Sequence, residues 1–409
     1  MPLGNSSLVN VAIIKETAFG VIPVSATPNA AKFLRVTGES LDYTINKEAS
    51  EEINSNRTVA SMIPLSGSAS GALESEVSYL EYDQIIESAL QSAFTVFGTN
   101  GVSTAFTGTF TATTITAAAA PTGSSAFTTL KKGQFFIVKG SGTANDGKVL
   151  RVSLVTAPSA AIITLDASTP AVVATGSATT TISTSRLVNG NTQSSFTIER
   201  QSPDVGEYWA YTGMTPSSLD VNISAGARST LSFNFMGKGL TRKTGSTNMP
   251  GTIAASKGYE IHSGVSGPSC LIWVDGAPLV GTYAQSLSFT YDNTLREQTA
   301  ICNLDAIGMG SGTIAATGTM EIYFNSGALY EKFATNTNVA VTFSTLDNDG
   351  NGYIVTLPKV NFSKVSTAAG GKDSDMMLSL EFTALDDRGN ADATLRNLIQ
   401  IDRVGVAAV

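Results

Sequence analysis

Few residues in this chain are of a type that could carry chemistry, and His262 is the most informative of them. It is the one histidine in the sequence, so a Ser-His-Asp or Cys-His relay would have to use it. It lies in Tyr259-Glu-Ile-His-Ser-Gly264, a segment without a nucleophile motif. The acid pairs Glu51-Glu52 and Asp386-Asp387 fall in polar loops, with no sign of the cleft that a glycosidase needs. We therefore expect no catalytic or cofactor-binding residue, and we do not expect an enzyme.

One loop has the spacing of a metal site. Asp347-Asn-Asp349-Gly-Asn351-Gly352 resembles the start of a calcium-binding loop, with oxygen ligands at alternate positions and glycine in sixth place. The twelfth position, which should be Glu, is Pro358. Because strand patterns flank the loop on both sides, a β-hairpin turn is favoured over calcium binding. Histidine–cysteine clusters with zinc spacing are absent from the sequence, so no metal ligand is expected.

The composition favours a β-rich protein. Charged residues make up 14% of the 409 residues, where about a quarter is usual, and 38 glycines accompany many Ser, Thr and Ala residues. This mixture suits strands and tight turns better than helices. The net charge of −8 opposes binding to phosphate backbones, and the basic clusters at 131–132 and 238–243 are too short to indicate a nucleic-acid site.

The sequence also bears on localisation and redox state. Its N-terminal residues lack the positive region of a signal peptide, and no stretch approaches the ~20 apolar residues of a membrane span. We expect synthesis in the cytoplasm and no membrane anchor. Cys270 and Cys302 are too few for a disulfide scaffold, and both are expected to be reduced and buried.

A weak internal repeat is the main clue to how the chain is organised. Ser40-Leu-Asp-Tyr-Thr-Ile-Asn46 resembles Ser286-Leu-Ser-Phe-Thr-Tyr-Asp292, which begins 246 residues later, and Gly71–Val77 matches Gly318–Phe324 at an offset of 247. Short helical patterns follow at 82–90 and 329–334. The chain is therefore expected to use a strand–loop–strand–helix unit twice, with long loops at 47–70 and 292–317.

Thr, Ala, Ser, Gly and Val predominate in residues 101–187, which indicates a small all-β domain inserted into the first unit. Strands are expected over 106–116, 134–139, 148–156, 162–166 and 178–184, with a tight turn at Asn145-Asp-Gly147. The expected organisation is an N-terminal arm (1–32), a first unit (33–100 plus 188–240), the insertion (101–187), a connector (241–282), a second unit (283–391) and a C-terminal arm (392–409).

Several stretches resemble the major tail tube proteins of siphophages, which have long non-contractile tails. The resemblance covers most of the chain, and the stretches that carry it are Lys15–Gly20, Phe33–Tyr43, Gly67–Tyr79 with Tyr82-Asp83, Phe196–Arg200 and Phe233–Lys238. The resemblance implies a mainly β fold of two tandem tail-tube-type β-sandwich or barrel units, each with one flanking α-helix, plus the inserted all-β domain as an outer decoration.

The same resemblance implies a structural virion protein whose rings stack into a hollow tube, through which the genome passes during ejection. Because the unit is used twice, a pseudo-sixfold ring would need three chains. The expected partners are further copies of the chain, a tape-measure protein, and tail-terminator and tail-tip proteins. Double-stranded DNA would transit without specific binding.

Strand phase then assigns candidate residues. The candidates for a polar face toward the lumen are Asp42, Thr44, Glu74, Glu76, Ser288, Thr290 and Glu321. The candidates for contacts between rings, in the two long loops, are Glu51, Glu52, Arg57, Arg296 and Glu297.

Other classes of protein stay open at this point. A tube protein of a contractile tail or a secretion apparatus would use the same unit. A surface adhesin or pilus-type β-protein should carry an export signal, which the N-terminus lacks. A carbohydrate-active enzyme would need an aromatic-lined cleft, and Trp209 and Trp273 are the only tryptophans.

Overall fold

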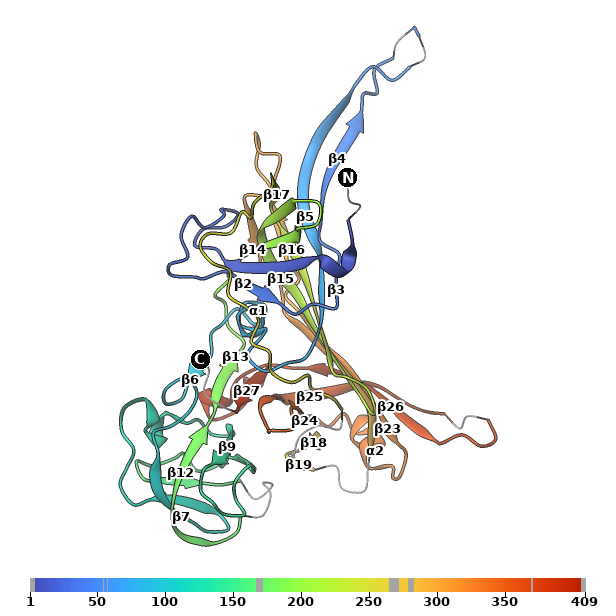
Figure 1. Ribbon diagram of the computed structural model, residues 1–409. Helices are drawn as coiled ribbons and strands as arrows, with labels where there is room; N and C mark the ends of the chain where they lie inside the picture. The colour runs from blue at the N-terminus through green and yellow to red at the C-terminus, as the bar shows by residue number, and fades with distance from the viewer. Residues whose placement is uncertain are drawn as a thin grey trace.

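A computed structural model describes residues 4–53, 55–56, 58–166, 172–264, 272–278, 283–368 and 371–405. The predicted mainly β fold is confirmed (Figure 1). The described residues form two α-helices, α1 (Asp83–Ala89) and α2 (Ala328–Ala334), and both fall where the helical patterns predict them.

We call the residues up to Thr244, without the insertion, the first half of the chain, and those from Ile272 on the second half. One long antiparallel sheet runs through both halves, and we call it the main sheet. Its strands, in spatial order, are β4 (Asp42–Ala49), β5 (Met62–Glu76), β16 (Thr230–Gly237), β15 (Glu207–Ser224), β20 (Ala284–Asp292), β23 (Ala315–Tyr323), β26 (Met377–Ala384) and β25 (Gly352–Ala368). The short strand β3 (Gly38–Glu39) continues the line of β4 along β5. The pairing of β15 with β20 joins the two halves into a single sheet.

The two longest strands leave the main sheet and enter a second layer. Each has a register irregularity near its middle, between Pro216 and Ser218 in β15 and between Phe362 and Lys364 in β25. Bulges bend a strand and increase its twist. In the second layer β15 lies between β14 (Phe196–Ser202) and β17 (Gly239–Thr244), and β25 lies between β24 (Val339–Leu346) and β27 (Gln400–Val404).

Two short strands from the beginning of each half extend the second layer. β1 (Asn10–Lys15) and β2 (Lys32–Leu34) follow β14, and β18 (Ile272–Val274) and β19 (Ala277–Pro278) follow β24. The strand order is therefore the same in the two halves. Residues 1–32 and 392–409, which are expected to be arms, contribute the buried strands β1 and β27 to this layer.

Apolar side chains at alternate strand positions fill the space between the two layers. β16, β20 and β26 each alternate between buried and partly exposed residues along their length. The buried positions form one cluster with the second layer and with helix α1, and this cluster includes Leu73, Phe233, Leu219, Phe289 and Phe343. The other face of the main sheet is left without a covering layer of the described chain.

The insertion forms its own six-stranded sheet. Its strands, in spatial order, are β10 (Val149–Arg151), β9 (Phe135–Lys139), β12 (Thr175–Ser183), β7 (Phe106–Phe110), β8 (Thr114–Ala117) and β11 (Ile162–Thr164). The single strand expected over 106–116 is wrong, because the chain turns at Thr111, whose amide donates to the Thr114 carbonyl at 2.9 Å. Asn145-Asp-Gly147 lies in the turn between β9 and β10, with Gly147 at φ +78°.

The insertion packs on the outer face of the second layer, away from the main sheet. Phe135 and Trp273 have ring centroids 5.4 Å apart, and Ile354 and Val404 complete the buried cluster between them. After β12 the chain continues into β13 (Ser185–Val188), which pairs with β27 and with β6 (Thr95–Val96). The insertion therefore leaves the first half and rests on the second (Figure 1).

Two smaller features complete the fold. The loop between β20 and β23 contains the hairpin of β21 (Arg296–Gln298) and β22 (Gly308–Gly310). In this loop Cys302 is exposed at φ +68°, so the expectation that it is buried is wrong, and Cys270 lies outside the described residues. Single turns of 3-10 helix occur at Ser6–Leu8, Gly123–Ser125, Phe127–Thr129 and Ala393–Leu395.

Candidate functional site

The uncovered face of the main sheet is lined by polar side chains. Because successive strand residues point to opposite faces, burying one set of positions leaves the alternate set on the other face. One row across the sheet runs from Glu74 through Ser232 and Asp220 to Thr290, each paired with the next. A second row runs through Ser288, Thr319 and Glu381, and the Ser288 and Thr319 hydroxyls are 2.6 Å apart.

The seven residues proposed for the polar face all occupy these alternate positions. Asp42 and Thr44 pair with Ser70 and Ser68 at one edge, and Ser286 pairs with Glu321 further along the sheet. Glu76, at the end of β5, forms an ion pair with Arg228 in the turn after β15. Strand phase therefore brings Asp42, Thr44, Glu74, Glu76, Ser288, Thr290 and Glu321 onto one surface.

Three further carboxylates on this face are not among the predicted residues, namely Asp220, Asp292 and Glu381. Asp220 accepts a hydrogen bond from the Thr290 hydroxyl at 2.6 Å, which links the two halves across the β15–β20 junction. Glu381 pairs with Lys364 at 2.7 Å. The alternation in Ser218-Leu-Asp-Val-Asn222 carries the signal for Asp220, since the apolar positions there alternate with polar ones as in β20.

The face is strongly acidic. Leaving aside the part of β4 and β5 beyond Thr44 and Ser68, seven of the described alternate positions carry Asp or Glu and one, Lys364, carries a base. The acidic side chains are Asp42, Glu74, Glu76, Asp220, Asp292, Glu321 and Glu381. Such a surface repels phosphate, and a concave arrangement of it would strengthen the field.

The long loops lie together at one end of the main sheet, but they differ in shape. The first loop is shorter than the expected 47–70, because β4 runs to Ala49 and β5 begins at Met62. β4 and β5 form a long curved hairpin whose outer part projects beyond the body of the protein, and we call the described residues of that part, 45–53, 55–56 and 58–65, the arm (Figure 1). The loop between β20 and β23 instead folds back toward the base of the arm. There the Tyr43 hydroxyl donates to Asp305 at 2.6 Å, and the Gly67 amide donates to the Leu304 carbonyl at 2.8 Å.

The contact with Asp305 affects the pKa of the Tyr43 phenol. Burial and the adjacent Asp305 carboxylate raise the pKa of its phenol to about 12, so the hydroxyl stays a donor across the ordinary pH range. Of the loop candidates, Glu51 and Glu52 are exposed on the arm, and Arg296 and Glu297 are exposed on β21. Arg57 lies outside the described residues.

Two strand edges of the main sheet have no partner among the described residues. β15 is covered on both sides near its C-terminal end, by β16 and β20. The corresponding part of β25, residues 361–368, pairs only with β26. At the opposite margin β4 pairs only with β5. Exposed strand edges offer unpaired backbone groups to another chain.

Helix α1 lies where the two halves meet. Its Asp83 carboxylate accepts hydrogen bonds from the Tyr353 hydroxyl of β25 and from Arg403 of β27. The Tyr353 hydroxyl in turn accepts from the Leu80 amide at 3.0 Å, and the Arg403 guanidinium lies 4.7 Å from the centre of the Phe94 ring. This network fixes the position of the second half on the first.

The metal-like loop is a hairpin turn between β24 and β25. Asp347 accepts from the Asn351 amide and from its side chain, at 2.7 and 2.9 Å. The Lys139 ammonium of the insertion donates to the Asn351 side-chain oxygen at 3.1 Å, so a protein cation already bonds one of the oxygens that a metal would use. Within the described ranges no group of three His, Cys, Asp or Glu side chains could hold a metal ion.

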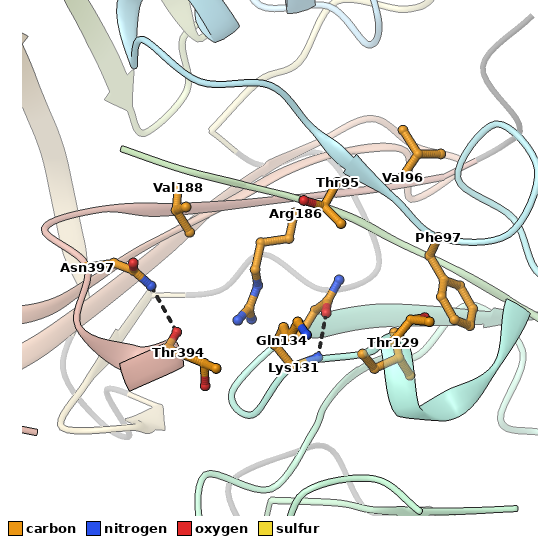
Figure 2. A pocket seen from close by; sticks show the side chains of 11 residues that line it. Thr95, Val96, Phe97, Thr129, Lys131, Gln134, Arg186, Val188, Thr394 and Asn397 are labelled. Carbon is orange, nitrogen blue, oxygen red and sulfur yellow. Dashed lines mark hydrogen bonds between the residues drawn. The ribbon is translucent and has the colours of Figure 1, made fainter. Parts of the chain in front are cut away.

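A pocket of about 250 Å³ lies between the insertion and the rest of the chain. Figure 2 shows its lining, in which Arg186 and Gln134 lie on one side and Phe97 on the other. The Arg186 guanidinium is paired with Asp402 at 3.0 Å and also donates to the Lys132 carbonyl at 3.2 Å. Its charge is thus neutralised from within the protein, and the pocket presents no acid–base pair.

Comparisons with known proteins agree with the architecture. No curated protein sequence matches the chain. No helix in the described ranges has the length and apolar content to cross a membrane. A family model described as phage tail tube protein matches residues 6–384. The chain therefore belongs to the phage tail tube protein family and is a structural component of the virion that assembles with copies of itself into the tail tube.

Proposed function

We propose that three copies of this chain close into a pseudo-sixfold ring, and that stacked rings form a tube whose acidic lumen conducts the genome. The observation that carries this proposal is the β15–β20 junction, where one half of the chain continues the sheet of the other. The free edge of β25 is equivalent to the covered edge of β15, and β4 is equivalent to β20. A second copy can therefore repeat the junction with the same geometry.

The strand pairing also supplies a register for this contact. In the first half Leu219, Phe233 and Leu73 form one row, and Glu39 completes it. The equivalent row in the second half is Val365, Leu380, Met320 and Leu287. Since Leu219 pairs with Tyr291, we infer that Val365 of one copy pairs with Tyr43 of the next, with Lys364 opposite Thr44.

In the isolated chain two strand edges of the main sheet stay unpaired, and a closed ring would pair them. Closure removes the two free strand edges. Three chains with eight strands each place 24 strands around the lumen. With strands about 4.8 Å apart and tilted by about 40°, such a barrel is about 50 Å across at the backbone. The side chains that project inward leave a channel wide enough for a DNA duplex.

The acidic face would then line the channel. A wall of Asp and Glu repels phosphate, so DNA slides along it rather than binding. The insertion, on the outer face of the second layer, would project from the outside of the tube. A projecting domain leaves no room for a contractile sheath, and we therefore propose a long non-contractile tail, with tape-measure, terminator and tip proteins as the further partners.

A cross-linking experiment tests ring closure. With Cys270→Ser and Cys302→Ser as background, Thr44→Cys and Lys364→Cys should form disulfides between copies, because paired cross-strand Cβ atoms lie about 5 Å apart. On a non-reducing gel we expect a ladder that stops at three chains. Ser218→Cys with Asp292→Cys is the matched control, since this pair is the equivalent one within a single chain and should leave a monomer band.

Electron microscopy of the unmodified protein supplies the second measurement. Hollow tubes with outward projections are expected. A protein that stays monomeric at high concentration and gives no cross-linked species would overturn the proposal, and a ladder that extends to six chains would overturn the threefold ring.

A further inference from the structure

We propose that the arm of one copy docks on an aromatic surface at the opposite end of the main sheet of a second copy, in the next ring of the stack. We call this surface the end patch, and it consists of Tyr283, Tyr323, Phe324 and Met376. The inference rests on the proposed function and names the axial contact within it.

The arm exposes more apolar surface than a free hairpin should. Ile53, Val59, Met62, Ile63 and Leu65 are all exposed, from 52% for Leu65 to 99% for Ile53. Met62 pairs with Ala49 and Ile63 with Glu48, so apolar side chains stand on both faces of the hairpin. A long apolar hairpin that reaches into solvent calls for a partner chain.

The end patch is a second apolar surface, and its members are neighbours. The Tyr323 amide donates to the Tyr283 carbonyl at 2.9 Å, and the Phe324 amide donates to the Met376 carbonyl at 2.9 Å. Their exposed fractions run from 36% for Phe324 to 71% for Tyr283. Aromatic residues and methionine are enriched in the buried centres of protein interfaces.

The register places the two surfaces at opposite ends of the sheet. The arm extends from the end of the sheet where Asp42 and Asp292 lie, and the end patch adjoins the other end, where Glu76, Ser224 and Ser286 lie. Figure 1 shows the arm and the ends of β23 and β26 far apart. Two different surfaces at opposite ends form a head-to-tail contact, which generates an open stack.

Each chain offers one arm and one end patch among its described residues. In the first half, the end that corresponds to the patch is covered by the connector, where the His262 amide donates to the Val77 carbonyl at 2.9 Å. In the second half, the loop that corresponds to the arm is held down by its contacts with Tyr43 and Gly67. Because each chain has one arm and one end patch, every arm in a ring can dock on an end patch of the next ring.

Paired substitutions test the contact from both sides. Met62→Ser with Ile63→Ser removes apolar groups from the arm, and Tyr323→Ser with Phe324→Ser removes them from the patch. Truncation of a central interface residue commonly weakens binding about tenfold, so we expect the protein concentration needed for tubes to rise at least about tenfold in either variant. Val155→Ser is the matched control, since Val155 is an exposed apolar residue on the insertion.

The readouts separate this inference from the proposed function. Each double variant, combined with Thr44→Cys and Lys364→Cys in the cysteine-free background, should still give the three-chain species while tubes are lost. Tubes at the wild-type concentration in both double variants would overturn the axial contact alone. Failure of the unmodified chain to form rings would overturn the proposed function and this inference together.

A cross-link across the contact guards against a folding defect in the serine variants. Met62→Cys with Phe324→Cys, in the same background, should join chains of successive rings and extend the non-reducing ladder beyond three. Tubes that form without this cross-link under oxidising conditions would overturn the inference.

Discussion

The two halves of the chain share a strand order but differ in how their helices are covered. Ile85, the third residue of α1, is fully buried, whereas Tyr330, the third residue of α2, is 48% exposed. Four residues of α1 are buried, and none of α2 is. The second half contributes to this difference, because Tyr353 and Arg403 bond Asp83 of α1 and the Asn293 side chain donates to the Ala89 carbonyl. Nothing in the described chain does the same for α2.

The sheet edges show the same asymmetry. The first half has its β15 edge covered by β20, and the second half has its β25 edge open. A single chain therefore contains one completed strand junction, β15 with β20, which we call the finished junction. It also carries two open edges, on β25 and on β4, that could form an equivalent junction with other copies. The finished junction is a template for the contact between copies, so perturbing it in the isolated chain shows what that contact requires.

The largest effect is expected from Arg403→Ala, where the second half contacts α1. Arg403 and Asp83 are both largely buried, and the substitution leaves the Asp83 carboxylate without its cation. Breaking a buried ion pair in this way costs about 3–5 kcal/mol. Urea denaturation of the dilute chain should show a loss of this size in the free energy of unfolding.

Arg388→Ala is the matched control for that experiment. Arg388 pairs with Asp386, but both side chains are exposed, and such pairs contribute about 0–1 kcal/mol. Equal losses in the two variants would show that the α1 network does not hold the halves together.

A pH-dependent effect is expected from His262, which covers the end of the first half but has no counterpart in the second. The imidazole is fully buried, and neither ring nitrogen has a hydrogen-bond partner in the described chain. Burial lowers its pKa from 6.5 to about 4, although the Asp347 carboxylate opposes the shift. Below pH 6.5 the unfolded chain binds a proton that the folded chain does not.

The free energy of unfolding should therefore fall as the pH drops from about 6.5 to 4, by up to about 3 kcal/mol in total. The variant His262→Met removes the titrating group and should flatten this part of the profile. Denaturation midpoints of both proteins at several pH values provide the measurement. Parallel profiles for the two proteins would show that another group is responsible.

Local patterns in the sequence were sufficient for the two helices, for the central parts of most main-sheet strands and for the polar face. Alternation in Ser286–Asp292 predicts both the strand and the side on which Ser288 and Thr290 lie, because strand phase depends on neighbouring residues alone. The helices at 83–89 and 328–334 follow from apolar spacing in the same way.

Contacts between residues far apart in the sequence could not be predicted from these local patterns. The pairing of β15 with β20 joins segments that local periodicity does not relate. The pairing also aligns Tyr43 with Tyr291, two residues away from the sequence match of Tyr43 with Phe289. Because the difference is even, the polar and apolar faces are unchanged. The buried network of Asp83, Tyr353 and Arg403 is likewise invisible in sequence, since its members are brought together only by the fold.

The smallest effect in the isolated chain is expected from Tyr330→Ala on the exposed helix, and it tests the comparison most directly. Tyr330 is half-exposed and its ring centroid lies 6.1 Å from that of Phe333, so its truncation should cost about 0.5–1.5 kcal/mol, whereas Ile85→Ala at the same helix position should cost about 2–5 kcal/mol. If α2 takes up beside the next copy the place that α1 has beside the second half, Tyr330→Ala will lower the urea midpoint of the dilute chain much less than Ile85→Ala does. The same variant will weaken ring formation, as measured by the yield of the three-chain cross-linked species. An unchanged yield would mean that the two helices differ in role as well as in exposure, and that the internal junction is a template for the strand contact alone.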